Sequence, residues 1–405
     1  MKDDNTVQFL DKTSPPHLST LILLSGIGAL AMNMFLPSLP AMAEYFGTEY
    51  AVMQLSVPLY LLFSAGLQLI IGPVSDNLGR RNVLLWGLVI YMVATLGCIY
   101  APTTGVFLMF RCAQAIVAVT MVLSRAIVRD MFTQDKAASM IGYVTMGMAL
   151  VPMISPAVGG LLDQAFGWQA TFWAMFAVGG IVFAQVWFDL GETSVRSGKT
   201  MRQQFREYPE LLKSPRFWGY SMAAACCSGA FFAYLGGAPF VGSEVFGMEP
   251  AELGLYFGAP AVGYFVGNFI TARMATTWGV NTLVLCGCLA NALGGSVSLL
   301  IFLAGYGSPV TFFGMMTLVG LGNGLCIPNA TAGLLSVRPH LAGTASGLGG
   351  AVMIGGGAGL SILAGSLLSK ETGAYPLLLI MLLTAAAGVV SILVVIRREK
   401  ALGIS

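Results

Sequence analysis

The residues best suited to chemistry in this chain lie in a short loop between two apolar segments. The loop reads Gly72-Pro-Val-Ser-Asp76-Asn-Leu-Gly79-Arg80-Arg81. Its glycines and proline favour a tight helix exit, and the Asp76 carboxylate can accept hydrogen bonds from a helix N-terminus. The paired arginines can bind carboxylates on a neighbouring helix end. We predict a latch between helix ends. Its predicted members are Gly72, Asp76, Gly79, Arg80 and Arg81, with Arg129 and Asp130 as partners.

Arg111 is the only charged residue well inside a long apolar segment. A charge at the centre of a membrane helix costs roughly 2.5–3.5 kcal/mol, so it is a functional candidate. Two interpretations stay open. Arg111 binds an anionic group of a ligand, or it is a structural arginine that hydrogen-bonds Asn33, Gln114 and backbone carbonyls.

Further candidates for ligand binding are polar or aromatic residues within apolar segments, because small-molecule sites are apolar pockets with a few polar anchors. The predicted ligand-binding residues are Asn33, Tyr60, Arg111, Gln114, Phe231, Tyr234 and Asn323.

Enzymatic and metal chemistry find little support in the sequence. All seven cysteines lie in apolar segments, and their Cys-Cys and Cys-Gly-Cys spacings do not match a zinc pattern. We expect them to pack as small hydrophobic residues. No nucleophile–base pair or carboxylate pair is placed inside an apolar segment. The sequence therefore predicts no enzyme, no cofactor and no metal.

The composition excludes most classes of soluble protein. Of the 405 residues, 56% are hydrophobic and only 9% are charged, against about 25% charged in soluble domains. A net charge of +2 offers no basic face for nucleic acid. The lipid bilayer is therefore the expected environment.

Charge-poor runs of more than about 20 residues each predict membrane-spanning helices, because a strand of a membrane barrel needs only about ten residues. Two long runs must each fold back once, at 101–104 and at 305–309. The predicted count is twelve, from the runs 18–43, 50–75, 82–124 (two spans), 137–162, 164–188, 217–243, 253–272, 274–337 (two spans), 341–369 and 372–396. The predicted fold class is an all-α integral membrane protein with two six-helix bundles.

The distribution of Lys and Arg predicts the orientation of these spans. With the N-terminus inside the cell, 18 of the 20 cationic residues lie on the inner side, and only Lys370 lies in an outer loop. Both termini are therefore expected in the cytoplasm, and the polar start is no signal peptide. The expected domains are an N-tail (1–17), an N-terminal bundle (18–189), a linker (190–216), a C-terminal bundle (217–396) and a C-tail (397–405).

The loop at 72–81 resembles the signature loop of the major facilitator superfamily. Phe110-Arg111-Cys-Ala-Gln114 is similar to a second family motif, and Pro152-Met-Ile-Ser-Pro156-Ala-Val-Gly159-Gly160 is similar to the signature of family antiporters. Other segments resemble the bicyclomycin and chloramphenicol resistance branch of the drug–proton antiporters. These segments are Leu36–Pro40, Leu59–Tyr60, Gln68, Ser124–Asp130 and Gly343–Gly347.

The resemblance implies a multi-pass, monomeric carrier of the bacterial inner membrane that exports drugs or small amphipathic metabolites by alternating access. It implies protons as the coupling ion, and it favours Tyr234 and Asn323 because the family places spans seven and ten at the cavity. One departure is Asn33, which stands where the branch usually has an aspartate and which cannot exchange a proton. An uncoupled facilitator or an importer of an anionic or zwitterionic metabolite is therefore the first alternative. The second alternative comes from a different functional class and is a membrane sensor that transports nothing.

Overall fold

The computed structural model describes residues 9–14, 16–131, 151–152, 154–193, 208–338 and 342–403. Every regular element in these ranges is a helix. The first half contains α1 (Leu18–Asn33), η1 (Leu36–Ser38), α2 (Leu39–Tyr45), α3 (Tyr50–Gln54), α4 (Ser56–Leu78), α5 (Arg80–Ile99), α6 (Thr104–Gln114), η2 (Ala115–Val117), α7 (Ala118–Met131) and α9 (Gln169–Asp189). The second half contains α11 (Tyr208–Leu212), α12 (Pro215–Phe240), η3 (Val241–Val245), α13 (Pro250–Tyr256), α14 (Ala259–Trp278), α15 (Val280–Leu303), α16 (Pro309–Ser336), α17 (Ala342–Leu367) and α18 (Tyr375–Leu402).

Eleven helical segments of the described part are long and apolar enough to cross a membrane. They correspond to eleven of the twelve predicted spans, and both predicted reversals are confirmed. Of the predicted fifth span, residues 151–152 and 154–162 are described and are helical, whereas 137–150 lie outside the described residues. The second reversal falls between α15 and α16, where the Ser308 hydroxyl accepts a hydrogen bond from the Thr311 amide at 3.2 Å. Such a cap satisfies a backbone donor that would otherwise be unpaired at the helix start.

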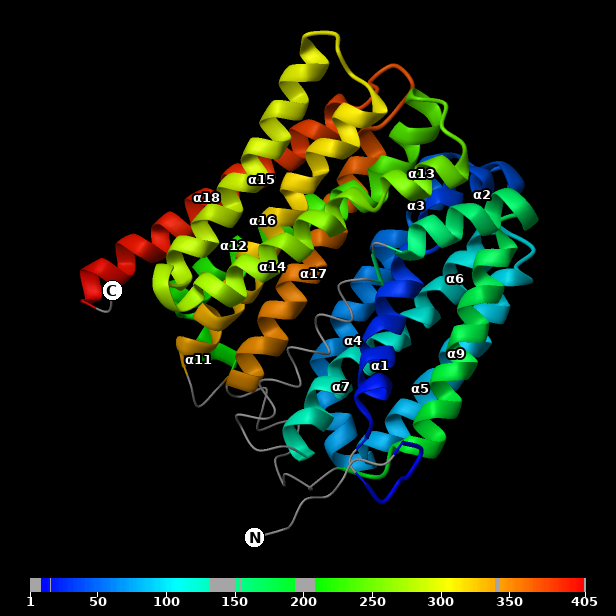
Figure 1. Cartoon of the computed structure of the whole chain (residues 1–405), viewed down its shortest axis with the longest axis vertical. Coiled ribbons are helices and arrows are strands. Elements are labelled where there is room, and N and C mark those ends of the chain that lie inside the picture. Colours follow the sequence, from blue (N-terminus) through cyan, green and yellow to red (C-terminus); the bar gives the residue numbers. More distant parts are fainter. Residues whose placement is uncertain are drawn as a thin grey trace.

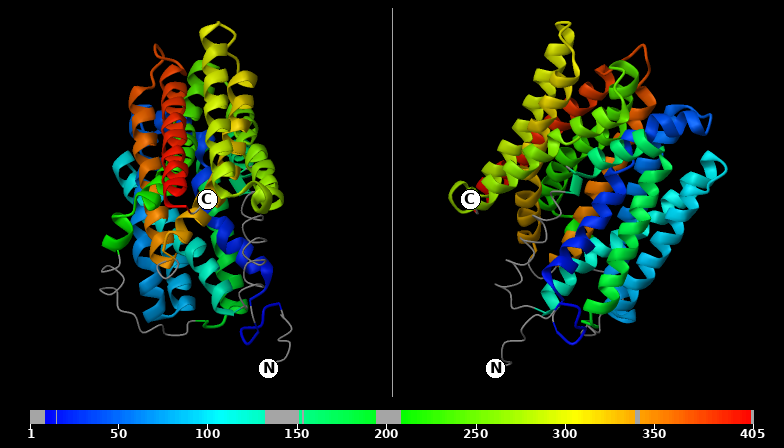
Figure 2. Two further views of the ribbon diagram at one scale, coloured as in Figure 1. Left: turned by 90° about the vertical axis from the view of Figure 1, so that its left-hand side faces the viewer. Right: turned by 45° about the vertical axis from the view of Figure 1, so that its right-hand side comes forward.

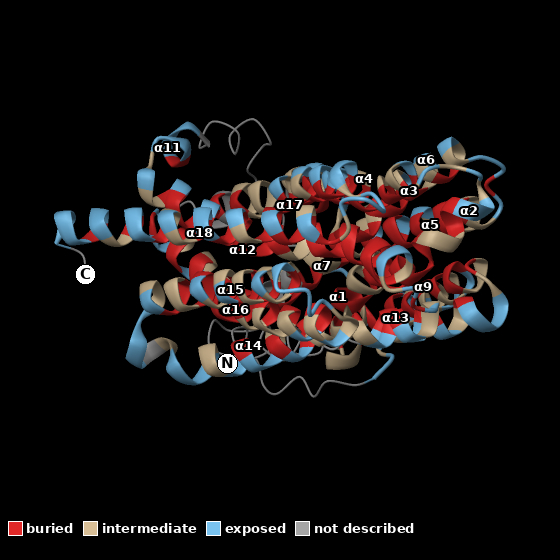
Figure 3. Ribbon diagram, turned by 90° about the horizontal axis from the view of Figure 1, so that it is seen from above, coloured by how far each residue is buried: buried red, intermediate tan, exposed pale blue. Residues whose placement is uncertain are grey.

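Large apolar side chains cover the outside of the molecule as well as its interior. Trp86 and Leu383 are each 68% exposed, and Leu300 is 63% exposed. Figure 3 shows the buried residues between the helices and the exposed ones around the rim. Such a surface is unfavourable in water and is matched by the hydrocarbon of a bilayer.

The helices form two groups (Figures 1 and 2). Helices α1, α4, α5, α6, α7 and α9 pack on one another, as do α12, α14, α15, α16, α17 and α18. The groups meet where α17 packs on α4, and where α12 and α13 contact η1. Figure 1 shows α2, α3 and α13 close together at one end of the molecule, which we term the closed end.

At the opposite end the ribbons of the two groups diverge, and the start of α1 and the end of α18 lie on that side (Figures 1 and 2). The helix ends there carry most of the described cations, including Arg80, Arg216 and Arg397. We term it the charged end. The two ends of the molecule therefore differ both in charge and in how closely the groups approach.

Candidate functional site

Arg111 lies at the centre of the N-terminal group and is fully buried. Its guanidinium carbon lies 4.2 Å from the centre of the Phe35 ring and 4.4 Å from the centre of the Tyr60 ring. Its two terminal nitrogens donate to Gln114 Oε1 at 2.5 Å and to the Ala31 carbonyl at 2.9 Å. Cation–π contacts of this kind stabilise a desolvated arginine without a counter-ion.

The polar contacts of Arg111 continue into α5. Gln114 donates through Nε2 to the Thr95 hydroxyl at 2.7 Å, and Thr95 donates to the Tyr91 carbonyl at 2.7 Å. Among the described residues, the Arg111 Nε group has no hydrogen-bond partner. The structure thus brings the predicted residues Tyr60, Arg111 and Gln114 together, and it links α1, α4, α5 and α6 through them.

Asn33 lies at the end of α1 and is 3% exposed. Its Nδ2 donates to the Ala29 carbonyl of its own helix at 2.7 Å. The contact to Arg111 from this stretch comes instead from the Ala31 carbonyl. The side-chain amide of Asn33 therefore donates its hydrogen bond within its own helix in this conformation.

The predicted residues of the C-terminal group lie in two different places. The ring of Tyr234 packs against Phe231, Phe257, Phe312 and Phe313, and its hydroxyl has no partner among the described residues. Asn323 on α16 instead accepts a hydrogen bond from Asn291 on α15 at 3.3 Å. The amide of Asn323 thus joins two helices of one group.

The predicted antiporter motif lies in the contact between the groups at the closed end. A Cβ added to Gly160 would overlap the Pro250 carbonyl at the start of α13. In return, a Cβ added to Gly254 would lie against the Pro156 carbonyl, and a Cβ on Gly159 would overlap the carbonyl of Met34. Glycine is the residue that permits such close approach of two backbones. Pro152 lies one turn before Pro156 and is half-buried.

Among the described residues, two hydrogen bonds cross between the groups near the closed end. Gln54 on α3 is 2% exposed and donates through Nε2 to the Ser361 carbonyl on α17 at 2.8 Å. Tyr50 donates through its hydroxyl to the Gly236 carbonyl on α12 at 2.9 Å. Sequence reasoning missed both residues. Their spacing of four, which places them on one helix face at the start of a span, is the signal that could have found them.

A cavity of about 450 Å³ opens at the closed end between the two groups. Its walls come from α2, η3 and α13, and they include the carboxyl groups of Glu44 and Glu244. Glu244 forms an ion pair with Lys370 at 2.9 Å. The cavity lies on the side opposite the charged end, and a lysine pairs with one of its two acidic residues.

The predicted latch loop begins a new helix at Gly79, whose φ of +90° suits glycine. The Glu192 carboxylate, which follows α9, accepts the Arg80 amide hydrogen at 2.9 Å and fills the space beside Gly79. Arg81 donates to the carbonyls of Trp187 and Leu190 at 3.1 and 2.7 Å. The side chains of Asp76, Arg129 and Asp130 and the surroundings of Gly72 lie outside what the structure describes.

A corresponding arrangement exists in the C-terminal group. Gly279, with φ of +77°, precedes α15 as Gly79 precedes α5. Glu399 near the end of α18 accepts a hydrogen bond from Asn281 Nδ2 at 2.5 Å and one from the Tyr220 hydroxyl at 3.0 Å. It also pairs with Arg216 at 2.6 Å.

Thus, in each group, a carboxylate after or near the end of the last helix ties down the helix that starts at this glycine. The sequence did not indicate Glu192 or Glu399, because each lies more than 100 residues from its partners.

Comparison with known proteins gives a consistent result. A family model described as "Major Facilitator Superfamily" matches residues 21–361. A chloramphenicol resistance protein of Pseudomonas aeruginosa is 32% identical over 380 residues, covering 91% of this chain and 88% of that protein. A bicyclomycin resistance protein homologue of Haemophilus influenzae is 28% identical over 378 residues, covering 92% and 94%.

Among solved structures, a bacterial homologue of the human lysosomal transporter Spinster, crystallised in an inward-facing and occupied conformation, is similar with a TM-score of 0.71. It is 17% identical and the match covers 95% of this chain and 96% of that one. The likeness concerns the helical architecture.

Proposed function

Because the chain belongs to the Major Facilitator Superfamily, we propose that it exports small amphipathic molecules, drugs among them, by alternating access across the bacterial inner membrane. The chain is a multi-pass membrane protein of a transporter family and not an enzyme. The names of its relatives, which refer to resistance to chloramphenicol and bicyclomycin, support drug export.

The observation that carries the proposal is the difference between the two ends of the molecule. The groups touch through backbone contacts at the closed end and diverge at the charged end. Cytoplasmic loops are rich in Lys and Arg, which supports our placing the charged end and both termini in the cytoplasm. This placement supports an inward-facing state, from which rocking of one group against the other would exchange access.

We propose a positioning role for Arg111 rather than direct binding of an anionic substrate. Its guanidinium lies against the Phe35 and Tyr60 rings, and none of its surface is exposed. A ligand anion has no route to it in this state. The partly buried side chain of Phe231 on α12 suits an amphipathic substrate better, whereas Tyr234 is as fully buried as Arg111 in this state.

Proton-coupled antiport is the first candidate for the energy source, as in the resistance branch that the sequence resembles. The position of Asn33 favours a second candidate, uncoupled flux. Asn33 cannot titrate, and the buried acids among the described residues, Asp163, Asp189 and Glu399, all lie near span ends.

Flux of radiolabelled chloramphenicol from proteoliposomes, with and without a pH gradient of about one unit, tests the proposal. Antiport requires the flux to respond to the gradient and to collapse with a protonophore. Flux that does not depend on the pH gradient would favour the second candidate, uncoupled transport. Liposomes with the wild-type chain that transport no member of a panel of anionic, neutral and cationic drugs would contradict the drug-export proposal.

A further inference from the structure

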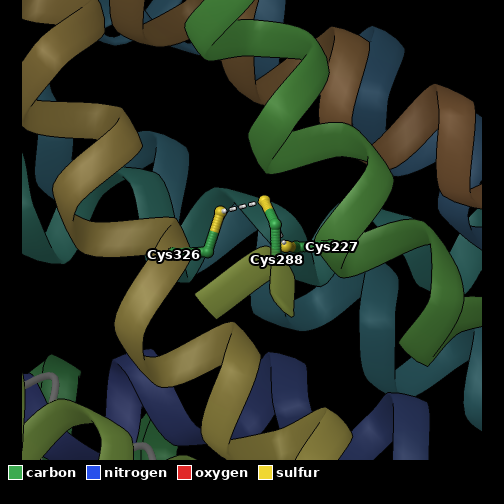
Figure 4. A group of neighbouring side chains, drawn as sticks. All are labelled: Cys227, Cys288 and Cys326. Carbon is green, nitrogen blue, oxygen red and sulfur yellow. Dashed lines mark hydrogen bonds between the residues drawn. The ribbon is translucent and has the colours of Figure 1, made fainter. Parts of the chain in front are cut away.

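Three cysteines from three helices meet in the core of the C-terminal group. Cys227 lies on α12, Cys288 on α15 and Cys326 on α16 (Figure 4). The Sγ atoms of Cys227 and Cys288 are 3.5 Å apart, those of Cys288 and Cys326 are 4.0 Å apart, and all three lie within 4.8 Å of one another. All three side chains are fully buried, and all three thiols are free.

These distances fit three ligands of one central atom. Bonds of about 2.3 Å from each sulfur to a shared atom place the sulfurs roughly 3.3 to 4.0 Å apart, depending on whether the geometry is pyramidal or planar. The observed set requires only small side-chain adjustments to reach that range. Thiol groups select soft, thiophilic elements over hard cations.

Within the described part of the chain, no charged side chain acts on the three thiols. The groups that act on them are the three thiols themselves, Cys226 and the Asn291 amide. The Oδ1 atom of Asn291 is buried and has no hydrogen-bond partner among the described residues. Glycines leave room beside the thiols, since a Cβ added to Gly388 on α18 would lie 3.4 Å from the Cys288 sulfur.

Charge balance selects the class of ligand. Three thiolates around a monovalent cation would carry a net charge of −2, and around a divalent cation −1, inside a low-dielectric helix bundle. Such burial is costly without a compensating charge. A trivalent element bound by three thiolates is neutral.

We propose that Cys227, Cys288 and Cys326 form a binding site for trivalent arsenic or its heavier congener antimony. Arsenous acid is small and uncharged, so it can enter the bundle without an ionic cost. Three As–S bonds form and three As–OH bonds break. Each thiol proton leaves with one hydroxyl as water, and the oxidation state of the arsenic does not change. The product ties α12 to α15 and α16, and α12 also carries Phe231 and Tyr234.

The test uses the full chain in lipid nanodiscs, kept reduced and treated with sodium arsenite. Bound arsenic is counted by mass spectrometry after gel filtration, and sulfur-to-arsenic charge-transfer absorbance is recorded. We expect about one arsenic per chain in the wild type. We expect affinity to fall more than about 100-fold in Cys288→Ser, since loss of even a supporting group beyond the ligands costs about 10–100-fold.

Cys286→Ser is the matched control, because Cys286 lies two residues away on the same helix and outside the cluster. It should bind arsenite like the wild type and gain thermal stability from it, as a ligand specific for the folded state requires. Cys288→Ala is measured as well, and gel filtration and circular dichroism show whether each variant is folded. A folded alanine variant that has lost arsenite binding excludes a folding defect as the cause. Arsenate, which does not exchange with thiols in this way, should not be retained.

Equal arsenite binding by Cys286→Ser and Cys288→Ser would overturn the assignment. So would retention of no arsenic by the reduced wild type, or thiol titration that shows a disulfide between Cys227 and Cys288 that persists in the reductant of the assay. A preference for silver(I) over arsenite would overturn the charge-balance argument and with it the choice of a trivalent ligand.

Discussion

The guanidinium of Arg111 lies 4.4 Å from the centre of the Tyr60 ring, and among the described residues no carboxylate accompanies it. A charge inside a bundle is here stabilised by two aromatic faces, an amide oxygen and a backbone carbonyl. The arrangement needs no buried acid, which would titrate, and it holds four helices of the N-terminal group together.

Arg111→Lys should lower the thermal stability of the purified protein, although it keeps the charge. Lysine lacks the planar fork that reaches both Gln114 and Ala31, and it stacks less well between the rings. We expect a loss of about 2 kcal/mol, within the range of lost charged hydrogen bonds. The residual transport should show an unchanged KM for the drug. An increase in KM only for anionic drugs would contradict the positioning role.

Gly160→Ala should open the closed end. The added methyl group would overlap the Pro250 carbonyl, and overpacking costs about 1–3 kcal/mol. Double electron–electron resonance between spin labels on Glu44 and Glu244 should report longer distances. Gly180→Ala is the matched control, because nothing lies within 4 Å of a Cβ at that position. An unchanged distance distribution in Gly160→Ala would show that the contact does not hold the groups together.

Gln54→Ala should also favour opening of the closed end, but by less than Gly160→Ala does. It removes the buried hydrogen bond from the Gln54 amide to the Ser361 carbonyl. Hydrogen bonds between membrane helices are worth about 0.6 kcal/mol on average, so the ratio of the two states should change about threefold. The same resonance measurement checks this, with a substitution of the exposed Gln164 by alanine as the reference. A shift in the opposite direction would contradict the proposed contact.

Glu399→Gln should weaken the charged end of the C-terminal group. The substitution removes the charge that pairs with the largely buried Arg216, and breaking such a pair costs about 3–5 kcal/mol. Thermal unfolding in detergent should show a lower Tm. Arg216→Gln in the same background should restore some of the loss, since the double variant leaves no unpaired charge. Additive losses in the double variant would indicate that the two residues act separately.

Local patterns in the sequence were sufficient to predict the spans and their reversals. Runs of apolar residues set the helix lengths, and Gly305–Pro309 marked the break between α15 and α16. The grouping of Tyr60, Arg111 and Gln114 depends on packing that polar spacing hints at but does not determine. No periodicity relates Glu192 to Arg80 or Gln54 to Ser361, because these contacts join segments 112 and 307 residues apart.

The cluster of Cys227, Cys288 and Cys326 likewise could not be predicted from the sequence. The spacing of Cys286 and Cys288 and the pair at 226–227 match no known ligand pattern along the chain. Only the crossing of α12, α15 and α16 selects one cysteine from each helix and turns their sulfurs toward one another.

At the closed end, main chain packs directly on main chain, at Gly160 with Pro250 and at Gly254 with Pro156. Because no side chain lies between these backbones, a change of side-chain rotamer cannot separate them. In the alternating access proposed above, opening of this end therefore requires whole helices to move together. A compound that fills the cavity lined by Glu44 and Glu244 would touch both groups at once and so oppose that movement from outside the Arg111 region.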